Sequence, residues 1–176
     1  MKKRWIILML MVVSIFMLMG CSSKEKKSAA EIKVTKENAS YLEQYDKNLQ
    51  GFLKEMTSIL KTFNNALDGL YTKQYSKEQF SSLITGTIEK SNKLVSEVEA
   101  LDVDPELFEA HQNLILLVNT SHQLLLDAVD MANNEDGEIE KEELRTKLLE
   151  IKTSQAETTN QWKILRKELS ENAGKK

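Results

Sequence analysis

Apolar residues recur at alternating spacings of three and four through most of this chain, and this spacing constrains its fold more than any other feature. The first run continues for four heptads and consists of Leu42, Tyr45, Leu49, Phe52, Met56, Ile59, Phe63, Ala66 and Leu70. At 3.6 residues per turn, such residues lie on one face of a helix. Only one proline and six glycines occur in 176 residues, so little interrupts helix formation. The sequence therefore predicts an all-α protein with long amphipathic helices.

The start of the first helix has more than one candidate. Ser40 and Glu43 stand three residues apart and match a capping box, in which each side chain bonds the backbone N–H of the other residue. Thr35 and Asn38 are earlier candidates for the same role, because both residue types accept hydrogen bonds from free N–H groups at a helix start. We expect the helix to begin near residue 40.

The next two helices have clear start signals. Residues 76–79, Ser-Lys-Glu-Gln, match a capping box, and the seam that follows extends to residue 101. Asp104 precedes Pro105, and proline is favoured at the first position of a helix because its missing N–H is not needed there. The apolar seam of this third helix continues to residue 132 and is the widest in the chain, so we expect it to be the most buried helix.

The fourth predicted helix extends from about residue 139 to residue 169. Four helices joined by connections of about three to eight residues must each run antiparallel to their neighbours in sequence. The sequence therefore predicts an up-down-up-down four-helix bundle over residues 40–172, followed by a short tail at residues 173–176. About 135 residues suffice for a continuous core without disulfides.

The N-terminus has the features of an export signal. Three basic residues at positions 2–4 precede sixteen uncharged residues, 5–20. This run is short for a transmembrane helix, which needs about 20 apolar residues. It ends in Leu18, Met19, Gly20 and Cys21, which resembles the lipobox of bacterial prolipoproteins. The resemblance implies that residues 1–20 are a signal peptide, that cleavage occurs between Gly20 and Cys21, and that a diacylglyceryl group is attached to the sulfur of Cys21.

This resemblance implies a location and a mode of attachment. Residues 21–39 become the lipidated cysteine and a flexible tether, and the protein is held on the extracytoplasmic face of the cell membrane by acyl chains such as palmitate. Two or more acyl chains suffice for stable anchoring. Cys21 is the only cysteine, so no disulfide is expected in the mature domain.

Net charge narrows the class of partner. The whole chain has a formal charge of -3, and residues 1–20 include three basic and no acidic residues. The mature protein therefore carries a formal charge of -6, which argues against nucleic acid as a partner. The tether is the exception, because residues 22–40 contain five lysines and three glutamates.

The loop at residues 132–143 resembles an EF-hand calcium loop. Oxygen-bearing side chains that match its ligand pattern are Asn134, Asp136, Glu138, Glu140 and Glu143, and Gly137 matches the glycine of the sharp turn. Carboxylate and carbonyl oxygens are the ligands that calcium prefers. Ala132, however, stands where the first ligand belongs. We therefore favour a polar turn between two helices, with a weak calcium site as the alternative.

The two histidines, His111 and His122, both fall on the apolar face of the third predicted helix. Eleven residues separate them by about 16 Å, which is too far for one metal ion. We expect His111 to pack on Trp162. We expect His122 to join a polar layer inside the bundle that fixes helix register, with Thr87, Ser91, Gln155 and Thr158 as the other members. The alternative is a haem or small-ligand site at His122, with Met56 or Met131 as the second haem ligand.

No catalytic motif is present: there is no nucleophile elbow, phosphate-binding loop or H-E-x-x-H sequence. The sequence predicts a membrane-anchored, non-enzymatic binding or accessory protein without a cofactor, whose partner is another envelope protein. The alternative is a ligand-binding sensor that uses the calcium-like loop or the His122 site. The oligomeric state is not predicted.

Overall fold

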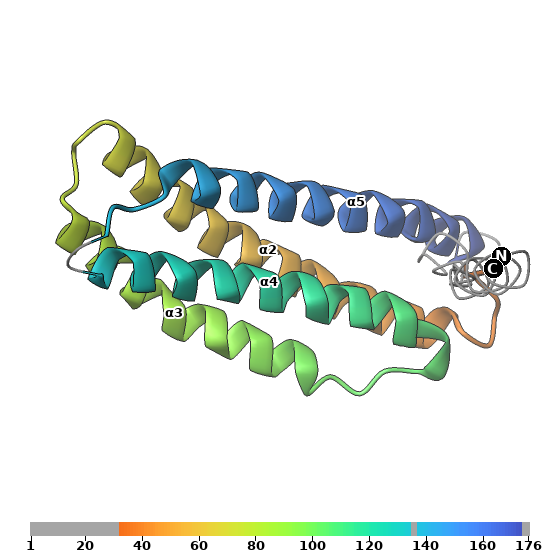
Figure 1. Ribbon diagram of the computed structural model, residues 1–176. Helices are drawn as coiled ribbons and strands as arrows, with labels where there is room; N and C mark the ends of the chain where they lie inside the picture. The colour runs from red at the N-terminus through yellow and green to blue at the C-terminus, as the bar shows by residue number, and fades with distance from the viewer. Residues whose placement is uncertain (1–31, 135–136, 174–176) are drawn as a thin grey trace, which may run out of the picture.

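The computed structural model describes residues 32–134 and 137–173 and consists of four long helices packed as a bundle (Figure 1). The elements are α2 (Ala39–Tyr71), α3 (Lys77–Glu99), the short 3-10 turn η3 (Pro105–Leu107), α4 (Phe108–Asn133) and α5 (Lys141–Ala173). The described ranges contain no strand. The prediction of an all-helical bundle with four long helices is confirmed.

Each helix packs against two principal neighbours. Helices α2 and α4 lie opposite each other, and each contacts both α3 and α5. Between α2 and α5, Arg166 bonds Asp46 near the start of α2, whereas Arg145 bonds Asp68 near its end. Residue numbers therefore fall along α5 as they rise along α2. Ten of the 26 residues of α4 are buried, against six of the 31 residues of α5 from Lys141 to Glu171.

The core is one continuous set of apolar side chains that extends along the bundle. Its largest fully buried members include Trp162, Phe63, Phe80, Leu42, Leu49 and Met56. All nine apolar positions predicted for the first seam are buried or half-buried in this core. The helical spacing of the sequence therefore places its apolar face correctly on α2.

Two predicted helix starts are confirmed. The hydroxyl of Ser76 accepts a hydrogen bond from the N–H of Gln79, and the Gln79 side chain accepts one from the N–H of Ser76 at 2.9 Å. The Asp104 carboxylate accepts a hydrogen bond from the N–H of Glu106 at 3.0 Å, and Pro105 occupies the first position of the turn that leads into α4. Both signals act within a few residues, which explains why the sequence shows them.

The predicted capping box of Ser40 and Glu43 is wrong. Helix α2 begins at Ala39, after Asn38. The N–H of Thr35 donates to the side-chain oxygen of Asn38 at 2.7 Å, and the N–H of Asn38 donates to the Thr35 hydroxyl at 3.3 Å. Asn38 is buried and also bonds Glu106, across the bundle, at 3.1 Å. This tertiary contact fixes the chain at Asn38.

The connection from α2 to α3 folds back onto the end of α2. The N–H groups of Gln74 and Tyr75 both donate to the carbonyl of Gly69, at 2.8 Å and 3.2 Å, and Lys73 has a φ of 59°. The Tyr75 ring covers Gly69 so closely that an added Cβ would lie 2.0 Å from it. Only glycine leaves room for the ring at this position.

None of the described helices is long and apolar enough to cross a membrane. The predicted signal peptide, Cys21 and the tether as far as residue 31 lie outside the described residues, as do residues 174–176. The structure therefore leaves the anchor as a prediction from the sequence.

Candidate functional site

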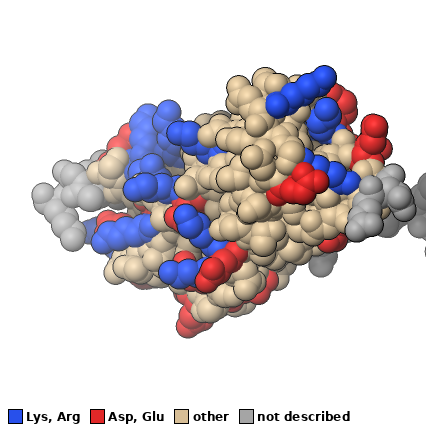
Figure 2. Space-filling model, turned by 90° about the vertical axis from the view of Figure 1, so that its left-hand side faces the viewer, with Lys and Arg blue, Asp and Glu red and all other residues tan. Residues whose placement is uncertain are grey.

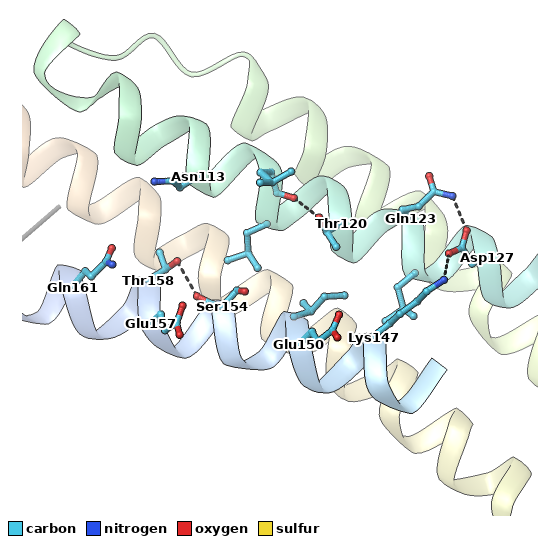
Figure 3. A pocket seen from close by; sticks show the side chains of 14 residues that line it. Asn113, Thr120, Gln123, Asp127, Lys147, Glu150, Ser154, Glu157, Thr158 and Gln161 are labelled. Atoms are coloured by element: carbon cyan, nitrogen blue, oxygen red, sulfur yellow. Dashed lines mark hydrogen bonds and ion pairs between the residues drawn. The ribbon is translucent and has the colours of Figure 1, made fainter. Parts of the chain in front are cut away.

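A surface groove of about 660 Å³ lies between α4 and α5 (Figure 3). The lining residues of α4 are Asn113, Leu116, Leu117, Thr120, Gln123, Leu124 and Asp127, and those of α5 are Lys147, Glu150, Ile151, Ser154, Glu157, Thr158 and Gln161. Both sets repeat at intervals of three, one, three, three, one and three residues. The groove is thus lined by one regular stripe from each helix, and it extends for about 21 Å at 1.5 Å per residue.

The α4 side of the groove carries no charge until its last turn. Residues 110–126 contain no Asp, Glu, Lys or Arg, in a chain in which 29% of residues are charged. Leu116, on this side, is 63% exposed, whereas Leu117 and Leu124 beside it are buried. Burying Leu116 against a partner is favourable by about 25 cal/mol for each Å² of apolar surface removed from water. This side of the groove therefore favours contact with apolar side chains.

The α5 side of the groove carries two unpaired carboxylates. Glu150 and Glu157 are exposed, and neither forms a hydrogen bond or ion pair within the described part of the chain. They stand seven residues apart, which is about 10.5 Å along one face of a helix. Figure 3 shows both on the α5 edge of the groove, across from the uncharged side chains of α4. This edge therefore favours contact with positive charge.

An ion-pair cluster closes one end of the groove. Lys147 bonds Asp127 of α4 at 3.0 Å and Glu143 of α5 at 2.8 Å, and Gln123 bonds Asp127 at 2.7 Å. Burial opposes ionisation of Asp127, but the hydrogen bonds from Gln123 and Lys147 outweigh it and lower the pKa of this carboxyl. Because Asp127 already neutralises Lys147, the remaining charge of the groove is that of Glu150 and Glu157.

The end of the bundle where α2 ends and α5 begins carries a cluster of charged side chains instead of an apolar surface. Figure 2 shows Lys and Arg side chains gathered on one side of this end, with Asp and Glu side chains among them. Arg145 donates to Asp68 at 2.5 Å and lies 4.9 Å from the centre of the Tyr71 ring, and Lys141 lies 5.4 Å from the same centre. Both basic groups have partners within the bundle.

His111 lies in an aromatic cluster at the end where α4 begins. The Tyr45 hydroxyl lies 3.1 Å from His111 Nδ1, and the Tyr45 and Trp162 ring centres are 4.9 Å apart. The prediction that His111 packs on Trp162 missed Tyr45, whose ring contacts both. His111 is 5% exposed, and its Nε2 has no hydrogen-bond partner among the described residues. Burial lowers the pKa of this imidazole.

The predicted polar layer forms only in part. His122 Nδ1 lies 3.1 Å from the hydroxyl of the buried Ser91, and this contact joins α4 to α3. Gln155 instead bonds Thr57 of α2 at 2.7 Å, so it belongs to another helix pair. The hydroxyl of Thr87 bonds a carbonyl of its own helix at 3.0 Å. The expected members thus form separate contacts, and only His122 and Ser91 bond each other.

The two methionines considered as haem ligands have other surroundings. The sulfur of Met56 lies 3.5 Å from the hydroxyl of Ser121, and Met56 is fully buried in the core. Met131 is half-buried against the same core. Neither residue lines the α4–α5 groove.

The calcium-like loop is in contact with a lysine. Lys77 Nζ donates to the carbonyl oxygens of Asn134 and Gly137, the second at 2.8 Å. Glu143 bonds Lys147, and Asp136 lies outside the described residues. Within the described residues, no three His, Cys, Asp or Glu side chains are placed to hold a metal ion. The calcium site therefore stays a prediction.

Comparison with models of protein families, with curated proteins and with solved structures finds no match for this chain. Function must therefore be inferred from the residues and their geometry.

Sequence reasoning missed the α4–α5 groove, although a signal for it was present. The uncharged stretch at residues 110–126 carries more apolar residues than one seam needs. Such an excess predicts deeper burial, and α4 does contain many buried residues. Leu116 shows that part of the excess faces solvent instead.

Proposed function

We propose that the protein is a lipoprotein of the bacterial cell envelope, anchored to the membrane through Cys21, whose helical bundle binds another envelope protein without catalysing a reaction. The observation that carries the binding role is the α4–α5 groove, which pairs an exposed leucine with two unpaired carboxylates. Exposed apolar surface rimmed by polar groups is typical of interaction sites. The order of residues 2–21 supports the anchor.

In this proposal, the end of the bundle at which α2 begins is the end nearest the membrane anchor. The chain enters α2 at Asn38, which bonds Glu106 at the start of α4, and Tyr45 packs on Trp162 of α5. The α2–α5 contacts support an up-down-up-down topology. They place the C-terminal part of α5 beside the start of α2, at the same end of the bundle. A helix of 33 residues is about 50 Å long. The groove therefore lies along the side of the bundle, and the tether leads from one end of it.

Two measurements on intact cells test this proposal. Metabolic labelling with palmitate should label the native protein and the matched control Ser22→Ala. It should not label Cys21→Ser, which should also keep residues 1–20 attached, because no thioether can form at serine. A photo-reactive amino acid at Leu116, and another at the exposed Leu149 or Ile164 of α5, should yield an adduct with a membrane or envelope protein from at least one position. Palmitate labelling of Cys21→Ser equal to that of the native protein, or no adduct from any position, would refute the proposal.

A further inference from the structure

The α4–α5 groove has a shape and a charge suited to binding one more helix. Its two lining stripes repeat at the same intervals, and residues spaced by three and four on neighbouring helices form the holes into which side chains of an added helix fit. The stripe from residue 113 to residue 127 corresponds to about four turns of helix. Recognition of a helix in a groove uses a short row of apolar anchors at this spacing.

The charges of the groove specify which helix fits. Glu150 and Glu157 are unpaired and seven residues apart on one edge, and the opposite edge is uncharged as far as Asp127, which is paired with Lys147. A helix with Lys or Arg at two positions seven residues apart would place both positive groups opposite these carboxylates, two turns from each other. The same helix would turn an apolar row toward Leu116 and the buried floor formed by Leu117 and Ile151.

We propose that this groove binds a basic amphipathic helix of about 14 residues from a partner protein, with apolar anchors over Leu116 and basic residues opposite Glu150 and Glu157. This inference rests on the proposed binding function and adds the chemistry of the partner. A second copy of the chain fits less well, because it would bring its own Glu150 and Glu157 and a net negative charge to a groove that is itself negative.

The test uses the full-length lipidated protein in a neutral detergent and two synthetic helical peptides. Both peptides have 14 residues and the same leucine row, held helical by a side-chain cross-link. One carries two lysines seven residues apart, and the other has two glutamates at those positions. Fluorescence anisotropy should show about tenfold tighter binding of the lysine peptide, a difference in line with two exposed ion pairs gained and two repulsions avoided.

Charge reversal in the groove should reverse this preference. The double variant Glu150→Lys/Glu157→Lys should bind the glutamate peptide better than the lysine peptide. Glu89→Lys/Glu168→Lys makes the same change of net charge at exposed positions outside the groove and should keep the original preference. Leu116→Glu should abolish binding of the lysine peptide, whereas Leu149→Glu, at another exposed leucine, should not. Circular dichroism confirms that each variant is folded.

Three outcomes would overturn the inference. The first is no binding of the lysine peptide, and the second is a preference that Glu150→Lys/Glu157→Lys leaves unchanged. The third is a dimer in analytical ultracentrifugation that Leu116→Glu converts to a monomer, which makes a second copy the occupant. The in-cell cross-links distinguish a failure of this inference about the groove from a failure of the proposed binding function. An adduct from Leu149 or Ile164 but none from Leu116 would leave the binding function in place and remove only the groove.

Discussion

Gly69→Ala should destabilise the protein, although the same change elsewhere in α2 should stabilise it. A Cβ at Gly69 would lie 2.0, 2.4 and 3.0 Å from three atoms of the Tyr75 ring, and ordinary contact begins at 3.4 Å. The ring must therefore retreat by at least 1.4 Å. The N–H of Tyr75 is bonded to the Gly69 carbonyl at 3.2 Å. This bond keeps the Tyr75 backbone beside Gly69, so the ring must leave its position by turning about its own side-chain bonds or by shifting the connection between α2 and α3.

The size of the effect follows from two opposed contributions. Replacing glycine by alanine inside a helix gains about 1 kcal/mol, because alanine loses less backbone entropy on folding. Overpacking costs about 1–3 kcal/mol when neighbouring groups must shift. We expect a net loss of about 1 kcal/mol in the free energy of unfolding for Gly69→Ala, because the overpacking outweighs the gain in helix propensity. Gly51→Ala, where nothing lies within 4 Å of the added Cβ, should gain up to about 1 kcal/mol.

Urea unfolding followed by circular dichroism measures this difference of about 2 kcal/mol between the two variants. The double variant Gly69→Ala/Tyr75→Ala serves as a control, since it removes the clashing ring and should recover part of the loss that Gly69→Ala causes. Gly86→Ala, with open space around its Cβ, provides a second matched control on α3. If Gly69→Ala stabilised the protein as much as Gly51→Ala does, the assigned packing of Tyr75 on Gly69 would be refuted.

Two further predictions concern charged and titratable groups. Arg166→Ala should lower the free energy of unfolding by about 1–2 kcal/mol in the same urea titration, because it leaves the Asp46 carboxylate, 11% exposed, without its bidentate partner. Lys167→Ala is the control: it breaks an exposed pair with Glu171 and should change the free energy of unfolding little. Burial lowers the pKa of His111 from 6.5, so the unfolded chain binds this proton more tightly, and stability should be lost as pH falls below about 6.5. His111→Gln should reduce that loss when unfolding is measured between about pH 7 and pH 5, and an unchanged pH dependence would contradict the assignment.

Local signals in the sequence determine most of the helix boundaries. The capping box at Ser76 and Gln79 and the Asp104–Pro105 start are confirmed because each involves hydrogen bonds or steric limits within a few residues. The start of α2 is the exception. The helix follows Asn38, the earlier candidate that the sequence offered, and Asn38 and Thr35 bond each other locally. Asn38 also bonds Glu106, 68 residues away in sequence, and no local pattern shows that contact.

Contacts inside the bundle required the tertiary structure. The sequence placed His122, Ser91 and Gln155 in one polar layer. His122 and Ser91 do bond each other, but Gln155 bonds Thr57 of α2 instead. Helical periodicity gives the face on which a residue lies and not the axial register between helices. A shift of one helical turn changes which side chains meet, so polar contacts of this kind follow from the packing of the whole core.

The sequence by itself determined that this chain forms long amphipathic helices, which residues face the core, and where most helices begin, because these properties depend on spacing and on short-range hydrogen bonds. Only the tertiary structure decided which part of the apolar surface of α4 stays open to solvent. Leu116 belongs to the same uncharged stretch as the buried Leu117 and Leu124. Which of them is covered depends on where α3 and α5 lie around α4, and that arrangement results from how all four helices pack together.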